Sequence, residues 1–204
     1  MCIRDSYERA LADYDLALKI KSTYVRAFHG RGDAFAAKND LDRAIVDYDA
    51  AIRLDPKGFD VYVSRSHAFG RKGDRTREIA DLEQATRLQP ANADAWNGLC
   101  WARALAGELE QALGNCDESL RLRPDDANTL DSRGLVQLKR ARLAEAIADF
   151  DAALARNPKL AASLYCRGVA RQRQGDTAAG DADVAAAKAL KADIAEEYAQ
   201  YGVK

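Results

Sequence analysis

The sequence predicts an all-α protein built from a repeated pair of antiparallel helices, and three observations support this fold class. Only 13 Gly and four Pro occur among 204 residues, and this composition, with abundant Ala, Leu, Asp and Arg, favours helix over sheet. The prolines recur every 34 residues, each after an amphipathic run that it would end: Pro56, Pro90, Pro124 and Pro158. Small, large and turn-forming residues recur in the same register. Because one thin helix pair leaves an apolar edge uncovered, this period predicts a solenoid of stacked pairs.

Two helices are expected in each 34-residue unit. The first helix carries a large residue four positions before a small one, as in Phe28 and Gly32. A column of turn-forming residues then ends this helix: Asn39, Gly73, Gly107, Ala141 and Gly175. The second helix carries residues such as Ala44, Tyr48 and Ala51, whose spacings of four and three place them on one helical face.

This register divides the chain into a partial repeat, five whole repeats and a cap. Residues 7–22 form the second helix of the partial repeat, and the whole repeats span residues 25–58, 59–92, 93–126, 127–160 and 161–192. The last unit has Ala192 where the others have proline. Residues 193–202 place Ile194, Tyr198 and Tyr201 on one side, so we expect a C-terminal capping helix that covers the exposed edge of the array.

The first six residues stand apart from the repeats. Met1-Cys2-Ile3-Arg4-Asp5-Ser6 resembles the translation of a transposase-end adapter used in preparing sequencing libraries. We therefore expect residues 1–6 to be an artefact of sequencing, with the natural protein entering near Tyr7 in the middle of a helix.

The units resemble tetratricopeptide repeats. The resemblance rests on the 34-residue period, the two-helix unit, the Trp96-x-x-Leu99-Cys100 element and the series Ala44, Tyr48, Ala51 and Pro56, and it extends from Tyr7 to about Ala192. It implies a right-handed superhelix in which the first helices of the units line a concave surface. In this family that surface holds extended or helical peptides from partner proteins.

Two charged columns run through the repeats. Arginine precedes the small residue of the first helix, and aspartate occupies one position of the second helix, except in the unit of Trp96, where Leu99 and Asn115 replace both. A joint change within one unit suggests that the two positions touch. We predict four structural pairs, each partly withdrawn from water: Arg31 with Asp47, Arg65 with Asp81, Arg133 with Asp149 and Arg167 with Asp183. A ladder of anion sites is the less favoured alternative, since each arginine has an internal partner.

The unit without the charged pair contains two cysteines. Cys100 occupies the small column and Cys116 the aromatic column, and these columns face each other. Two states stay open: a disulfide, which would indicate a periplasmic or secreted protein, or two reduced buried thiols in a cytoplasmic protein. Cys166 has no evident partner, and we expect a half-buried thiol rather than a nucleophile.

Composition and motifs argue against several functions. Lys and Arg total 31 against 32 for Asp and Glu, so a net charge of −1 gives no field that attracts nucleic acid or an anionic membrane. No apolar run approaches the ~20 residues that span a bilayer. His29 and His67 lack companions at metal-ligand spacing, and no phosphate loop, nucleophile elbow or zinc-protease motif occurs. We expect no catalysis, no cofactor, no metal, no nucleic-acid partner and no membrane insertion.

The resemblance supplies candidates for a peptide-binding groove, carried over column by column: His67, Asn97, Trp101, Asp131, Leu135, Leu138, Tyr165 and Val169. The paired Lys and Asn residues with which some family members clamp a terminal carboxylate are absent. The apolar set that includes Trp101, Leu135 and Tyr165 suits an aromatic or apolar anchor instead. The alternative is that Trp101 and Tyr165 pack against neighbouring helices or the final cap.

We therefore expect a non-catalytic scaffold that binds a partner protein or peptide on its concave face. Two other classes stay open. One is an accessory repeat region of a larger enzyme or secretion-related protein whose catalytic part lies upstream of Tyr7. The other is a module that self-associates through an uncapped N-terminal edge.

Overall fold

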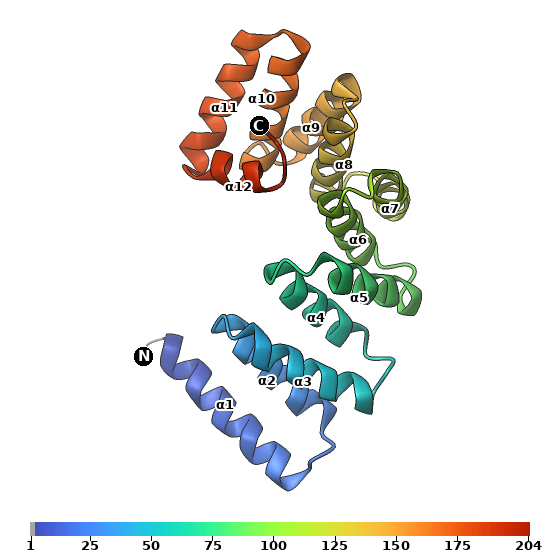
Figure 1. The fold of residues 1–204 in the computed structure, drawn as a ribbon, viewed down its shortest axis with the longest axis vertical. Helices are drawn as coiled ribbons and strands as arrows, with labels where there is room; N and C mark the ends of the chain where they lie inside the picture. Colours follow the sequence, from blue (N-terminus) through green and yellow to red (C-terminus); the bar gives the residue numbers. More distant parts are fainter. Residues whose placement is uncertain (1–2) are drawn as a thin grey trace. The chain divides into compact units, whose positions relative to one another are not determined.

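The computed structural model describes the backbone of residues 3–204 and the side chains from residue 7 onward. The predicted all-α fold class is confirmed: within residues 3–204 all regular secondary structure is helical, in twelve helices (Figure 1). Met1 and Cys2, part of the expected artefact, lie outside the described residues. None of the helices in the described range has both the length and the apolar character needed to cross a membrane.

The helices fall into two compact units, Met1–Pro90 and Ala91–Lys204. Unit 1 contains α1 (Ile3–Ile20), α2 (Val25–Ala37), α3 (Leu41–Leu54), α4 (Phe59–Arg71) and α5 (Arg75–Leu88). Unit 2 contains α6 (Ala93–Ala106), α7 (Leu109–Leu122), α8 (Ala127–Lys139), α9 (Leu143–Arg156), α10 (Ala161–Gln174), α11 (Thr177–Leu190) and α12 (Ile194–Gln200).

Within each unit, consecutive helices pack as antiparallel pairs that stack on one another (Figure 1). The pairs are α2 with α3, α4 with α5, α6 with α7, α8 with α9 and α10 with α11. The first helices also touch directly, α2 with α4 in unit 1, and α6 with α8 and α8 with α10 in unit 2. The first helices of unit 2 therefore form one continuous face.

Turn chemistry explains where the helices end. All five residues of the turn column have positive φ, from 58° at Ala141 to 100° at Gly175, which is the left-handed conformation that stops a helix. Glycine adopts it without strain, whereas Ala141 carries a Cβ there. One residue later, Asp40, Asp74 and Asp176 cap α3, α5 and α11 by accepting a backbone N–H in the first turn.

The small and large columns meet inside each helix pair. A Cβ placed on Gly32 would lie 2.6 Å from Cε1 of Tyr48, and one on Gly134 would lie 2.6 Å from Cε1 of Phe150. Tyr48 and Phe150 are fully buried at 1% and 0% exposure. The missing side chain on the first helix is therefore what lets a large side chain of the second helix fill the pair.

Replacing Gly134 with alanine tests this packing. Gly134→Ala should lower the free energy of unfolding by roughly 1–3 kcal/mol, because the buried Phe150 ring cannot move aside without strain. Gly114→Ala on α7 is the matched control, since a Cβ there meets nothing within 4 Å. It should stabilise the chain by about 0.5–1 kcal/mol through helix propensity alone. Urea unfolding followed by circular dichroism measures both values, and equal effects would contradict the packing argument.

Candidate functional site

All four predicted Arg–Asp pairs are in contact in the structure. In each pair Nε and Nη2 of the arginine donate to the two carboxylate oxygens of the aspartate, at 2.6–2.9 Å. The aspartates are buried, with exposures of 3–8%: Asp47, Asp81, Asp149 and Asp183. This bidentate geometry is the strong form of a charge-assisted hydrogen bond.

Each of these arginines also binds a second carboxylate, which the sequence argument missed. Nη1 donates to an aspartate on the second helix of the preceding pair, at 2.6–3.0 Å. These partners are Asp15, Asp49, Asp117 and Asp151, themselves a column with the repeat period wherever the arginine column is present. We call each set of one arginine and two aspartates a clamp. The clamps explain why the pKa of Arg31 and Arg133 is raised, chiefly by the hydrogen bonds to Asp47 and Asp149. The two carboxylates together accept hydrogen bonds from all three nitrogens of the guanidinium.

The repeat that lacks the clamp arginine, residues 93–126, contains a disulfide. The sulfurs of Cys100 on α6 and Cys116 on α7 are bonded at 1.99 Å, each one residue after the position of the missing pair, Leu99 and Asn115. Asn115 instead accepts a hydrogen bond from Nη1 of Arg103 at 2.8 Å. A covalent bond therefore joins the two helices where the ion pair is absent. The expectation of a half-buried Cys166 is wrong, since this thiol is buried at 1% exposure and burial raises its pKa.

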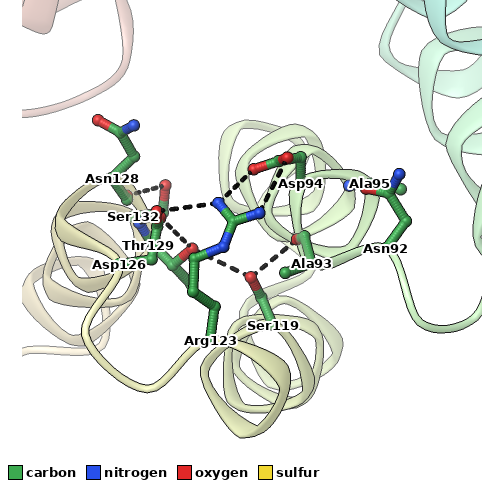
Figure 2. Close-up of polar contacts among 10 residues, drawn as sticks. All are labelled: Asn92, Ala93, Asp94, Ala95, Ser119, Arg123, Asp126, Asn128, Thr129 and Ser132. Atoms are coloured by element: carbon green, nitrogen blue, oxygen red, sulfur yellow. Dashed lines mark hydrogen bonds and ion pairs between the residues drawn. The ribbon is translucent and has the colours of Figure 1, made fainter.

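A polar network holds the first three helices of unit 2 together at one end (Figure 2). The buried hydroxyl of Ser119 donates to the carbonyl of Ala93 at 2.8 Å and lies 3.0 Å from the hydroxyl of Thr129. Arg123, at the end of α7, binds both oxygens of Asp94 on α6 at 2.8 and 3.1 Å. The network joins α6, α7 and α8, so it links two of the first helices that carry groove candidates, α6 and α8.

Five of the predicted groove residues form one surface on the first helices of unit 2, which we call the first-helix surface. It consists of Trp101 on α6, Leu135 and Leu138 on α8, and Tyr165 and Val169 on α10, all within one apolar cluster. The same cluster contains Ile194, Tyr198 and Val203 from the end of the chain, with Tyr201 packed against it. We call residues 194–204 the C-terminal segment.

The C-terminal segment packs on these predicted groove residues and covers them. Leu135 and Leu138 are each 1% exposed, Val169 is 2% exposed and Tyr165 is 6% exposed. The alternative interpretation, packing against the final cap, describes Trp101 and Tyr165. The cap itself differs from the expectation too: α12 contacts α10 and α11, and the segment continues over α8 to α6 rather than covering only the edge of the last pair.

Aromatic rings and two cations hold the segment. The rings form a continuous row, with Tyr165 5.7 Å from Tyr198, Tyr198 5.4 Å from Tyr201, and Tyr201 5.6 Å from Trp101 between ring centroids. Such tilted and edge-to-face contacts add to the free energy of apolar burial. At the rim, Nζ of Lys139 donates to the Tyr201 carbonyl at 3.0 Å, and Nη2 of Arg173 donates to the Lys204 carbonyl at 2.9 Å.

Two polar groove candidates belong to the same first helices, Asp131 to α8 and Asn97 to α6. Asp131 on α8 accepts a hydrogen bond from Ser163, and burial raises its pKa to about 6. Its charge also raises the pKa of Tyr198 and of Cys166, after burial as the main cause, which places Asp131 close to the C-terminal segment. Asn97 on α6 has a buried amide oxygen that accepts no hydrogen bond from the residues described.

His67 lies in unit 1, where it is exposed on α4. The polar group of unit 1 forms around the other histidine. Nε2 of His29 lies 3.0 Å from Oγ of Ser64 and 3.6 Å from Oδ2 of Asp33. A catalytic triad needs the carboxylate on the other ring nitrogen, so this arrangement does not provide one. Asp33 also accepts a hydrogen bond from the Tyr48 hydroxyl at 2.8 Å, which ties the group to the core.

Comparisons with known proteins agree with this architecture. The family model described as "TPR repeat" matches residues 32–73, and the one described as "Tetratricopeptide repeat" matches residues 64–127. This chain is a tetratricopeptide repeat protein. Proteins of this kind are generally protein-binding scaffolds and typically non-catalytic. No curated protein matches the chain.

Solved structures share the fold of this tetratricopeptide repeat protein. YrrB, titled "a TPR protein with an unusual peptide-binding site", has a TM-score of 0.69 and 19% identity over 92% of this chain and 97% of its own. MamA has a TM-score of 0.70 and 19% identity over 84% and 94%. PilW, titled a type IV pilus biogenesis factor, has a TM-score of 0.75 and 15% identity over 81% and 77%. At these identities the likeness establishes the fold alone.

The clamps of this tetratricopeptide repeat protein can be tested with a natural template. Arg133→Leu leaves Asp149 buried without its cation, so the free energy of unfolding should fall by about 1.5–3 kcal/mol. The double variant Arg133→Leu, Asp149→Asn reproduces the Leu99 and Asn115 of the clamp-free unit and should lose less than the single variant. Urea unfolding of both variants measures the difference. If the double variant loses as much free energy of unfolding as Arg133→Leu and Asp149→Asn lose together, the pairing is refuted.

The stabilising effect of the Cys100–Cys116 disulfide can be measured directly. Reduction should lower the free energy of unfolding by about 3 kcal/mol, the loop-closure value for a separation of 16 residues. The measurement is the urea midpoint with and without dithiothreitol, and Cys100→Ala, Cys116→Ala is the control, in which the reductant should change nothing. An unchanged midpoint for the wild-type chain would mean that the bond does not constrain the unfolded state.

Asp131 predicts a pH dependence with a definite sign. Its pKa rises from 3.8 in the unfolded chain to about 6 when folded, so the folded chain binds more protons between these values. The free energy of unfolding should therefore fall as pH rises from about 4 to 7. In Asp131→Asn this contribution is absent, so the variant should gain roughly 1–3 kcal/mol over wild type across that range. A difference that stays constant with pH would show that Asp131 is not buried as a charge.

Proposed function

We propose that this chain is a non-catalytic scaffold that binds a segment of another protein on the first-helix surface of unit 2. The proposal joins the general role of tetratricopeptide repeat proteins to one particular face of this molecule. It makes Trp101 and Tyr165 the aromatic anchors and places Lys139 and Arg173 at the polar rim.

One observation carries the proposal: this face already accommodates a short peptide segment, supplied by the chain itself. The segment inserts two tyrosines beside Trp101 and Tyr165 and gives backbone carbonyls to Lys139 and Arg173. Buried aromatic anchors surrounded by polar rim contacts are the features that carry binding energy in protein interfaces.

The compartment proposed for this function follows from the disulfide. Cys100 and Cys116 are bonded in the structure, and such bonds persist mainly in oxidising compartments. We therefore propose that the scaffold works in a periplasmic or extracellular space. Fractionation of the source cells, with the thiols trapped by an alkylating reagent before lysis, tests this. Finding the chain reduced and cytoplasmic would overturn it.

Site-specific photocrosslinking tests where a partner binds. A photoreactive side chain at Lys139 or Arg173 should crosslink to a partner captured by the full chain, because both positions border the first-helix surface. The controls are Ala148 on α9 and Ala182 on α11, which are exposed on second helices. Crosslinks from the first pair and not from the second are expected, and the crosslinked protein is then purified and titrated. Crosslinks from the second helices alone would overturn the assignment.

A further inference from the structure

The C-terminal segment spans more of the molecule than a cap requires. Covering the edge of the last helix pair needs contact with α10 and α11 only, and Ile194 and Tyr198 of α12 provide it at 1% and 4% exposure. The chain nevertheless continues across α8, and Tyr201 reaches Trp101 on α6, two repeats before the last. The segment therefore crosses the first helices of three successive repeats, as a bound peptide would.

The segment also has the composition of an amphipathic ligand. Its buried residues are Ile194, Tyr198 and Val203, whereas Glu196 and Gln200 face solvent. Only residues 191–193 connect it to α11. Such a short connection gives an effective concentration on the order of millimolar or above, so even a weak site stays occupied.

The surface beneath the segment is not optimised for permanent burial. Asp131 lies close to Tyr198 and Cys166, has Ser163 as its hydrogen-bond donor, and would be better hydrated with the segment away. Burial also lowers the pKa of Lys139, whose ammonium donates to the Tyr201 carbonyl. Desolvation of these two charges opposes the apolar contacts and reduces the net free energy of docking.

We propose that the C-terminal segment is an internal occupant of the first-helix surface, and that a partner segment with the same side-chain pattern displaces it. The pattern is two aromatic residues three positions apart and an aliphatic residue two positions later, as in Tyr198, Tyr201 and Val203. This inference rests on the proposed function and specifies its ligand. In the fraction of molecules whose surface is occupied by the segment, a partner cannot bind, so the apparent affinity for the partner falls. Only a partner segment with a matching side-chain pattern then binds tightly enough to displace it.

The test uses the full chain and a labelled synthetic peptide with the sequence of residues 191–204, followed by fluorescence anisotropy. The segment variant Tyr198→Ala, Tyr201→Ala should bind this peptide at least about 10-fold more tightly than the wild-type chain, because its own segment no longer competes. Tyr201→Ala alone, which removes a half-buried ring, should give an intermediate gain. A peptide with alanine at both tyrosine positions should not bind.

A third substitution separates occupancy from a purely structural cap. Adding Trp101→Ala to the segment variant should weaken peptide binding by about 10-fold, so substitutions in the segment and in the surface act in opposite directions. The matched control is Tyr24→Ala, an exposed tyrosine of unit 1, which should change nothing. Far-UV circular dichroism verifies that each variant keeps its helices.

Three outcomes would overturn the inference. They are equal affinity of the wild-type chain and the segment variant, no saturable binding to the segment variant, and a wild-type chain that sediments as a dimer by exchanging its C-terminal segment with a second copy. Each leaves the proposed function standing if the crosslinks from Lys139 and Arg173 are found. Absence of those crosslinks, with tight peptide binding to the segment variant, would place the failure in the proposed function instead.

Discussion

Each clamp arginine lies on one helix and binds carboxylates on two others. Its guanidinium therefore links one helix pair to the pair before it. Arg133, for example, joins α7 through Asp117 and α9 through Asp149 while it stands on α8. The buried carboxylate and its arginine belong to the same helix pair, whereas the aspartate of the preceding pair is about half exposed, with a side-chain exposure of 39–54%. The contact between pairs therefore adds the modest stabilisation of a partly exposed ion pair to the hydrophobic stacking of the repeats.

The clamp column is interrupted once, and the interruption shows what the clamp does. Leu99 on α6, the first helix of unit 2, cannot donate, and its would-be partner is the neutral Asn115. The Cys100–Cys116 bond links α6 and α7, the two helices of this pair. The covalent bond is therefore a substitute for the ion pair within this hairpin.

The first-helix surface is apolar, and the C-terminal segment lies on it. Its apolar residues need cover, since an exposed row containing Trp101, Leu135 and Tyr165 would promote association. The C-terminal segment supplies that cover through stacked rings and a few rim hydrogen bonds, at the cost of desolvating Asp131 and Lys139. These opposed contributions are the physical basis on which we propose that an outside segment exchanges with the C-terminal segment.

The sequence by itself determined the helix pairs, the turns and the partners within each pair, because these follow from spacing. Prolines every 34 residues, a glycine opposite Tyr48 or Phe150, and an arginine that disappears together with its aspartate are all local, repeated signals. The second aspartate of each clamp recurs in the same register, so the repeat spacing also contains this partner. Only the tertiary structure decided between a disulfide and two thiols, and between an open groove and one covered by Tyr198 and Tyr201. The C-terminal segment occurs once, outside the repeat, so no column predicts where it docks. Its position follows from three-dimensional complementarity between its side chains and a surface assembled from three separate repeats.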